Sequence, residues 1–220
     1  MRTRQPVKKH EPIIYIIDDD ESVRFSLDHL FRSVGFTTRS HVSTQDFLAI
    51  DRPDREACLV LDIRLQGTSG LDFQEQLNKA GIEIPIILMT GHGDIPMSVR
   101  GMKAGAIDFL TKPFRDQDML DAVAAALKVD RKRRASHQLL VDIESRYQSL
   151  TSREQQVMAL VTKGLLNKQV AGDLGISEVT VKIHRGSVMK KMGARTLPDL
   201  VRMADALKQR GIEGTSNTTV

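Results

Sequence analysis

The stretch IIYIIDDD, residues 13–20, decides the fold of the first half of this chain. Five apolar residues in a row suit a strand that is buried on both faces, as in a parallel sheet covered by helices on both sides. Three carboxylates follow at once. In an open parallel α/β sheet, ligands bind outside the carboxyl ends of the strands. The stretch therefore predicts both a central strand and one edge of a binding site.

Strand-like and helix-like segments then alternate along residues 13–129. Glu21–Val34 carries its apolar residues on one helical stripe and stops at Gly35. The other predicted strands are residues 36–40, 58–62, 84–90 and 106–112, and the other predicted helices are residues 44–49, 71–79, 96–103 and 118–129. Five strand–helix units in this order predict a doubly wound, five-stranded parallel sheet with right-handed crossovers.

Polar side chains also end three of the later apolar runs, namely Asp62, Thr90 and Lys112. Carboxylates crowded at strand ends repel one another unless a cation neutralises them, and hard oxygen ligands favour Mg²⁺. Asp62 suits a nucleophile that forms an aspartyl phosphate, with Lys112 and Thr90 stabilising the transferring oxygens. An acidic run is more often a solvated helix N-terminus. The four sites in strand order nevertheless predict a phosphate pocket.

Charge divides the chain into two parts. Its 220 residues exceed the usual size of a single domain. Residues 13–127 carry 11 Lys and Arg against 18 Asp and Glu, whereas residues 128–220 carry 17 against 9. A basic module beside an acidic one suggests a polyanion as the partner of the basic module.

Cysteine content and hydropathy indicate the cellular compartment of the protein. Cys58 is the only cysteine, which excludes an internal disulfide and suits a reducing compartment. No apolar run approaches the roughly 18 residues that span a bilayer, and no hydrophobic signal segment follows the charged N-terminus. We therefore expect a cytoplasmic protein that does not bind membranes, with disordered ends at residues 1–11 and 211–220.

The basic part begins with a predicted helix and continues as a helix-turn-helix. Residues 129–148 contain no proline or glycine and favour a helical linker, and the run Arg131–Arg134 suits a solvated helix face better than a phosphate contact. Thr151 and Glu154 form a capping box that opens a helix ending at Gly164. Further helices are predicted at residues 167–174, 177–192 and 197–208. A short helix, a glycine turn and a longer basic helix are typical of a DNA-binding helix-turn-helix.

Helical geometry sorts the longer helix into two faces. The predicted core face consists of Val181, Val188 and Met192. The opposite face, predicted to enter the major groove, consists of Val179, Lys182, Ile183, Gly186 and Lys190. Lys182 suits a guanine edge and Ile183 a thymine methyl group, whereas the flanking His184 and Arg185 suit phosphates. The predicted DNA-contacting residues are therefore Thr180, Lys182, Ile183, His184, Arg185, Gly186 and Lys190.

Residues 13–128 resemble the receiver domain of two-component response regulators, a flavodoxin-like fold. The stretch TGHGDIPMSVRGMKAGAIDFLTKPF, residues 90–114, resembles the FixJ-type subgroup. The resemblance implies that Asp62 accepts a phosphoryl group and that Mg²⁺ is bound by Asp18, Asp19, Asp62 and the backbone carbonyl of Arg64. It also implies a switch hydroxyl, a switch aromatic residue and a phosphate-binding lysine, which are Thr90, Phe109 and Lys112. Gln66 departs from the family pattern, which commonly has proline there.

Residues 150–207 resemble the LuxR-type DNA-binding domain in the pattern LTSREQQVMALVTKGLLNKQVAGDLGISEVTVKIHRGSVMKKMG. Gly186 departs from relatives that have a larger residue there. The two resemblances imply a receiver domain at residues 12–128, a helical linker at 129–148 and an all-α, four-helix DNA-binding domain at 149–210. They also imply a sensor histidine kinase, promoter DNA and RNA polymerase as partners. Phosphorylation is expected to cause homodimerisation through residues 96–103 and 118–127.

Two alternatives to a phosphorylation-activated transcription regulator stay open at this stage. An Mg²⁺-dependent phosphohydrolase of the haloacid dehalogenase type would have a second aspartate two residues after the nucleophile, where this chain has Arg64. That difference, together with a dedicated DNA-binding module, favours a protein that is not an enzyme. The other alternative is a DNA-binding regulator that works without phosphorylation and uses its receiver domain as an interaction domain.

Overall fold

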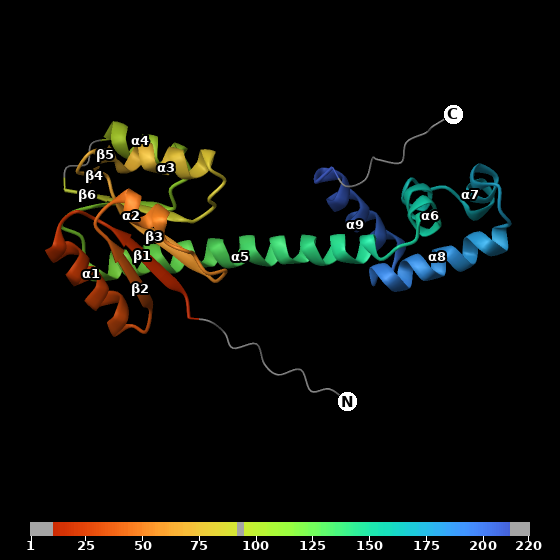
Figure 1. The fold of residues 1–220 in the computed structure, drawn as a ribbon, viewed down its shortest axis with the longest axis horizontal. Coiled ribbons are helices and arrows are strands. Elements are labelled where there is room, and N and C mark those ends of the chain that lie inside the picture. The colour runs from red at the N-terminus through yellow and green to blue at the C-terminus, as the bar shows by residue number, and fades with distance from the viewer. Residues whose placement is uncertain (1–10, 92–94, 212–220) are drawn as a thin grey trace. The chain divides into compact units, whose positions relative to one another are not determined.

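The structure is a computed structural model that describes residues 11–91 and 95–211 (Figure 1). It forms two compact units that divide between Arg134 and Ala135. The predicted disorder at the chain ends concerns residues 1–11 and 211–220, nearly all of which lie outside the described residues. Each unit is described below by itself.

The first unit contains the predicted five-stranded parallel sheet. Its strands are β1 (Ile13–Ile17), β2 (Thr37–His41), β3 (Ala57–Asp62), β6 (Ile86–Thr90) and β7 (Asp108–Thr111). Their order is β2-β1-β3-β6-β7, and every neighbouring pair is parallel. The helices between and after the strands are α1 (Glu21–Ser33), α2 (Thr44–Ala49), α3 (Gly70–Lys79), α4 (Ile95–Lys103) and α5 (Asp116–Gln148). The predicted doubly wound sheet is confirmed.

One short element was not expected from the sequence. Two-residue strands β4 (Arg64–Leu65) and β5 (Thr68–Ser69) pair antiparallel directly after β3. Gly67, with a φ of 83°, supplies the left-handed backbone conformation between them. Strands of this length carry no readable hydrophobic period, so the sequence gives no signal for the hairpin.

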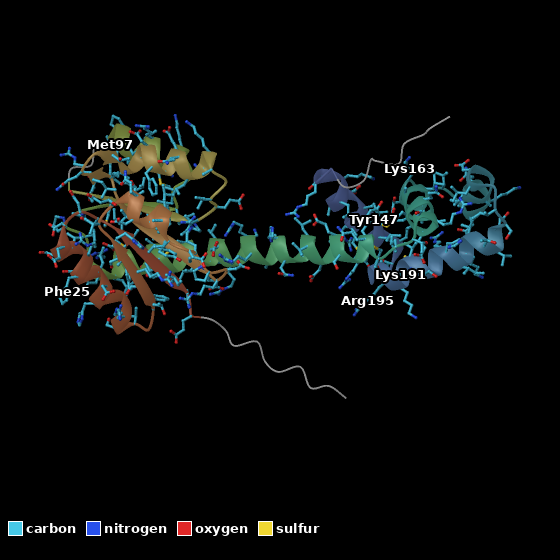
Figure 2. The ribbon with its side chains drawn as sticks, in the orientation of Figure 1. Phe25, Met97, Tyr147, Lys163, Lys191 and Arg195 are labelled. Carbon is cyan, nitrogen blue, oxygen red and sulfur yellow. The ribbon has the colours of Figure 1, made fainter. Side chains whose placement is uncertain are left out.

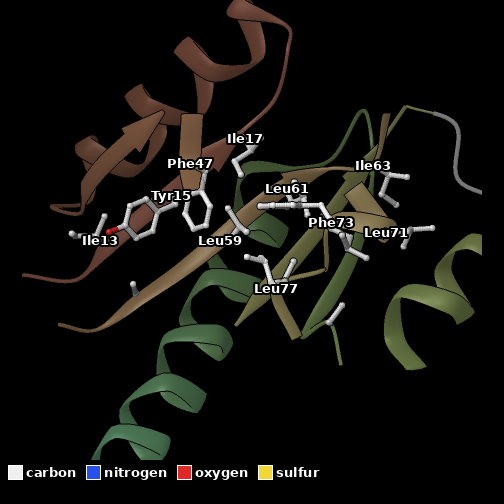
Figure 3. Close-up of a cluster of buried hydrophobic side chains, with 14 residues drawn as sticks. Ile13, Tyr15, Ile17, Phe47, Leu59, Leu61, Ile63, Leu71, Phe73 and Leu77 are labelled. Carbon is white, nitrogen blue, oxygen red and sulfur yellow. The ribbon is translucent and has the colours of Figure 1, made fainter. Parts of the chain in front are cut away.

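Helices cover both faces of the sheet, and this explains the continuous apolar runs. Alternate residues of β1 point to opposite faces. Ile13, Tyr15 and Ile17 pack with side chains from α2 and α3 (Figure 3). Ile14 and Ile16 pack instead with side chains from α1 and the first turns of α5. On the α2 and α3 face, the rings of Tyr15 and Phe47 pack edge to face, with their centroids 5.3 Å apart. Cys58 is buried on the other face, and burial raises the pKa of its thiol.

Helix α5 is one continuous helix through the predicted linker, so residues 129–148 are helical as predicted. The run Arg131–Arg134 is only in part the expected solvated face: Arg131 and Lys132 are exposed, but three of its four side chains pair with acids of the first unit. Arg131 Nε lies 2.5 Å from Glu56, Arg133 Nη1 lies 3.0 Å from Glu83, and Arg134 pairs with Asp54. These partners lie 50 to 80 residues away in sequence.

Asp130 completes this group of ion pairs. Its carboxylate is buried and accepts hydrogen bonds from Arg133, Arg134 and the backbone N–H of Ala57 at the start of β3. A buried carboxylate is costly unless its oxygens are paired, and here they are. The polar contacts therefore hold α5 to the first unit beyond the end of the apolar core.

The second unit contains the predicted four helices after the end of α5. They are α6 (Ser152–Thr162), α7 (Asn167–Leu174), α8 (Glu178–Met192) and α9 (Leu197–Gln209). The predicted capping box at Thr151 and Glu154 is present. Gly175 and Gly193, at φ values of 65° and 70°, end α7 and α8 in the left-handed conformation. Among the described residues, no helix is both long enough and apolar enough to span a membrane.

Candidate functional site

The carboxyl edge of the sheet in the first unit gathers the polar residues that follow its strands. Asp18 follows β1, Asp62 ends β3 and Thr90 ends β6. All three residues are at most 5% exposed, which is unusual for the carboxylates Asp18 and Asp62. The structure thus brings residues up to 72 positions apart in sequence to one edge, because parallel strands end on the same side.

Three carboxylates form a compact group at this edge. Oxygen atoms of Asp18, Asp19 and Asp62 all lie within 4.8 Å of one another. Asp20 has a different role, because it caps α1: its Oδ1 accepts from the N–H of Ser22 at 2.8 Å. The common explanation for an acidic run, a helix N-terminus, therefore holds for Asp20, whereas Asp18 and Asp19 join the cluster.

Lys112 provides the positive charge at this cluster. Its Nζ lies 2.7 Å from Asp18 Oδ2 and 3.3 Å from Asp62 Oδ1. Burial opposes the lysine charge, but the hydrogen bond to Asp18 and the charge of Asp62 outweigh it, so the pKa of Lys112 is raised. The lysine is therefore firmly cationic and ties two of the three carboxylates together.

At Asp62, unlike at Lys112, burial outweighs the favourable partner, and the pKa of the carboxyl is raised. Burial raises the pKa of its carboxyl, the Lys112 charge lowers it, and the nearby charges of Asp18 and Asp19 raise it again. Three acids with one lysine leave an excess of negative charge. Three carboxylates within 4.8 Å form an all-oxygen donor set, which is the chemistry that Mg²⁺ prefers.

Gly70 is a residue that the sequence did not single out. It begins α3, and its N–H donates to the carbonyl of Ile63 at 2.8 Å. A Cβ built on Gly70 would lie 2.3 Å from the backbone oxygen of Asp62, so no larger residue fits without a shift. The start of α3 is thus packed directly on the backbone of Asp62.

The other predicted residues of this site lie close by in the fold. Arg64 is exposed in β4, two residues after Asp62. Phe109 is half-buried in β7 and packs with the cluster on the α2 and α3 face. In the pairing of β6 with β7, Phe109 lies beside Leu88 and Thr111 lies beside Thr90. Thr90 and Phe109 are therefore diagonal neighbours on one face of the sheet. Residues 92–94 lie outside the described part of the chain.

In the second unit, α8 shows the two faces that its period predicts. Val181, Val188 and Met192 are buried, whereas Val179 and Ile183 are 69% and 63% exposed. Exposed branched aliphatic side chains on one helix face have no core to join, so this face is available to a partner. Gly186 lies on the exposed side with no atom within 4 Å of an added Cβ.

Basic side chains of α8 divide into two kinds. Arg185 Nη1 donates to Asn167 Oδ1 of α7 at 3.1 Å, and Lys191 Nζ lies 2.6 Å from the buried Glu154 of α6. These two residues join α8 to its own scaffold. Within residues 135–211, which the structure describes, Lys182 and Lys190 make no such contact and are exposed. Thr180 packs back on the cap, with its hydroxyl 2.8 Å from that of Ser177, and His184 is half-buried.

Two known families match the chain, one in each unit. Residues 14–124 match the response regulator receiver domain, and residues 148–204 match the luxR family of bacterial regulatory proteins. The chain belongs to the response regulator family. It joins a receiver domain to a LuxR-type DNA-binding domain.

Similar proteins share this arrangement along most of their length. Nodulation protein W of Bradyrhizobium diazoefficiens is 55% identical over 89% of this chain and 86% of its own. The transcriptional regulatory protein FixJ of Rhizobium meliloti is 44% identical over 87% of this chain and 94% of its own. The solved structure of the response regulator StyR is 48% identical, with a TM-score of 0.79 over 89% of this chain and 98% of its own. FixJ is named a transcriptional regulatory protein and StyR a response regulator. With its own receiver and LuxR-type DNA-binding domains, this chain is likewise a transcription regulator and not an enzyme.

Proposed function

We propose that this response regulator is switched by phosphorylation of Asp62, with a sensor histidine kinase as the phosphoryl donor. The observation that carries the proposal is a group at the carboxyl edge of the sheet, in which the buried Asp18 and Asp62 lie beside Asp19 and Lys112. A buried group with excess negative charge and one fixed lysine has little structural value by itself. It does suit a site that accepts a cation and a phosphoryl group.

The chemistry follows from the positions of the side chains. A carboxylate oxygen of Asp62 attacks the phosphorus of a phosphohistidine, the phosphorus–nitrogen bond breaks, and the histidine leaves. Lys112 lies 3.3 Å from Asp62 and balances charge on the transferring oxygens. Asp18, Asp19, Asp62 and the carbonyl of Arg64 would hold Mg²⁺, whose charge would offset the negative charge of the phosphoryl group.

The proposed switch lies beside this group. A phosphoryl group on Asp62 adds acceptor oxygens that attract the Thr90 hydroxyl, and movement of Thr90 makes room for Phe109 to rotate. Helix α4 carries an exposed apolar stripe, with Ile95 at 79%, Val99 at 43% and Met102 at 46% exposed. An exposed stripe of this kind suits a partner surface. We therefore expect phosphorylated chains to pair through α4 and residues 118–127 of α5.

The exposed face of α8 is the proposed DNA-reading surface. Lys182, Ile183, Gly186, Lys190 and Thr180 would face the major groove of promoter DNA, with His184 toward phosphates. Arg185, also predicted to contact phosphate, donates one N–H to Asn167 and has its other N–H groups left to reach a phosphate. Recruitment of RNA polymerase in the cytoplasm would then link DNA binding to transcription.

A phosphorylation assay with size measurement tests the proposal. The full-length protein would be incubated with acetyl phosphate and Mg²⁺, then analysed on a phosphate-binding gel and by light scattering. Wild-type protein should be phosphorylated and dimerise, whereas Asp62→Asn should do neither. Asp20→Asn is the matched control, because asparagine caps a helix as well as aspartate does and Asp20 lies outside the cluster. A phosphorylated Asp62→Asn chain would refute the assignment.

The remaining alternative is regulation of transcription without phosphorylation. In that case wild type and Asp62→Asn would have equal affinity for DNA before and after treatment with acetyl phosphate. The pairing of Lys112 with the buried Asp18 and Asp62 argues against this alternative, because a receiver domain used only for docking has no need of it.

A further inference from the structure

The last turns of α5 belong to the core of the second unit. Ile143 is buried in one cluster with Val188 and Met192 of α8, and Tyr147 packs against the same cluster. Figure 2 labels Tyr147, at the end of α5, and Lys191 of α8 in this unit. Lys191 Nζ also lies 3.4 Å from the carbonyl of Ser149, just past the end of α5. The end of α5 is thus part of the support of α8, although it precedes residues 148–204 that match the luxR family.

Arg146 makes the most specific contact between the two helices. Its Nη1 donates to the backbone carbonyl of Met192 at 2.9 Å, and Met192 is the last residue of α8. The final carbonyls of a helix have no partner within the helix, and they carry the negative end of the helix dipole. A guanidinium at this position satisfies one of these carbonyls and offsets the dipole, although much of the Arg146 side chain is exposed.

Gly193 is shaped to admit this contact. It follows Met192 with a φ of 70°, and its N–H donates back to the carbonyl of Lys190. A Cβ on Gly193 would lie 2.5 Å from Arg146 Nη1. Glycine therefore serves both the left-handed turn and the approach of the guanidinium. The left-handed turn by itself calls for glycine, and the same glycine leaves room for the guanidinium that donates to Met192.

We propose that Arg146 is a positioning residue that fixes the C-terminal end of α8 and so sets which of its side chains face the bases. Lys190 belongs to the last turn of α8, and the exposed Lys182 and Ile183 lie two to three turns earlier. Fraying of the helix end would re-aim Lys190, and a small rotation of the helix about its axis would re-aim all three. The inference rests on the proposed DNA-reading role of α8.

A direct contact between Arg146 and a DNA phosphate is the competing explanation, and the two differ in salt dependence. A lost phosphate contact lowers affinity for all sequences and reduces the slope of log affinity against log salt by about one. A lost positioning contact leaves that slope unchanged and reduces only the preference for the right sequence.

The experiment compares Arg146→Ala, Arg146→Lys and Arg210→Ala in the full-length protein. Arg210 is the matched control. Its Nη1 lies 2.7 Å from Glu144 of α5, so it also ties a helix end to α5, but that end belongs to α9 and not to α8. The DNA probe is a duplex enriched from a random pool by the wild-type protein, with a shuffled duplex as reference. Hydrogen exchange of the amides of residues 188–194 is measured without DNA.

Arg146→Ala should speed exchange in residues 188–194 and reduce the affinity ratio of enriched to shuffled duplex by about tenfold, the value of one charged hydrogen bond. Arg146→Lys should restore part of both effects, and Arg210→Ala should change neither. Unchanged exchange, an unchanged ratio or a lower salt slope in Arg146→Ala would each overturn the inference. If wild-type protein enriches no duplex, the proposed DNA-reading function fails, and hydrogen exchange then decides by itself whether Arg146 holds the end of α8.

Discussion

The group around Asp62 and the exposed face of α8 differ in origin and in exposure. The first is assembled from β1, β3 and the residue after β7, and its carboxylates Asp18 and Asp62 are buried. The second comes from one helix, and Ile183 on it is 63% exposed. A buried group is sensitive to charge, because each carboxylate depends on its neighbours. An exposed face is sensitive to orientation, because its side chains depend on how the helix is held.

Removal of the lysine should give the largest effect. Lys112→Met leaves Asp18 and Asp62 without their shared cation, so the rate of phosphorylation by acetyl phosphate should fall about 100- to 1,000-fold. The pKa of Asp62 should rise as well, because the Lys112 charge lowers it. Phosphate-binding gels over time measure the rate, and circular dichroism checks the fold. A rate within twofold of wild type would show that Lys112 has no part in the reaction.

Substitution of two lysines of α8 should affect DNA binding in one case and stability in the other. Lys182→Ala should weaken binding to the preferred duplex by about 1–3 kcal/mol and leave stability unchanged. Lys191→Ala removes the partner of the buried Glu154 and should lower the free energy of unfolding by about 1–2 kcal/mol. Fluorescence anisotropy and urea unfolding measure the two quantities. The reverse pattern, with Lys191 important for affinity and Lys182 for stability, would contradict the division of α8 into two kinds of basic residue.

Alanine substitution of two glycines, one tightly packed and one in open space, should change stability in opposite directions. Gly70→Ala forces a methyl group against the backbone oxygen of Asp62 and should cost about 1–3 kcal/mol of stability. It should also slow phosphorylation, since Asp62 must shift. Gly172→Ala, in the last turn of α7 with open space around it, should stabilise the chain by about 0.5 kcal/mol. Thermal unfolding compares the two variants. Equal melting temperatures for both would mean that α3 is not fixed at Asp62.

The smallest effect concerns pH. Because burial raises the pKa of Asp62 above its value in the unfolded chain, the native state holds this proton more tightly, and ionisation of Asp62 destabilises the fold. Without divalent cations, Asp62→Asn should therefore be more stable than wild type at neutral pH. The difference should shrink as the pH falls toward the ordinary carboxyl range. Urea unfolding at several pH values measures the difference in the free energy of unfolding between the two proteins. The account would be wrong if Asp62→Asn gained stability over wild type as the pH falls.

Much of this architecture could be predicted from the sequence, because buried parallel strands and amphipathic helices leave clear periods. The run Ile13–Ile17 indicates its strand, and the spacing of Val181, Val188 and Met192 indicates the buried face of α8. The ends of the elements leave a weaker pattern. The strand predicted from residue 84 begins at Ile86, because Pro85 has no N–H to donate and contributes only its carbonyl, to Leu59.

Contacts between distant residues could not be predicted. The role of Gly70 arises from the approach of α3 to Asp62, and a glycine at a helix start has no special pattern. The basic run Arg131–Arg134 resembles a solvated face, because its partners Asp54 and Glu83 lie far away in sequence. Arg185 was assigned to DNA from helical geometry alone, which does not reveal Asn167 beside it.

The central claim is that phosphorylation of Asp62 controls how tightly the protein binds its DNA sites through α8. Genome-wide mapping of DNA binding, in cells that carry wild type or Asp62→Asn, tests it most directly, with duplex affinity measured in parallel before and after acetyl phosphate. The account predicts that wild-type binding strengthens on phosphorylation at a defined set of sites and that Asp62→Asn stays at the weak level. Equal occupancy and equal affinity in both proteins would contradict it.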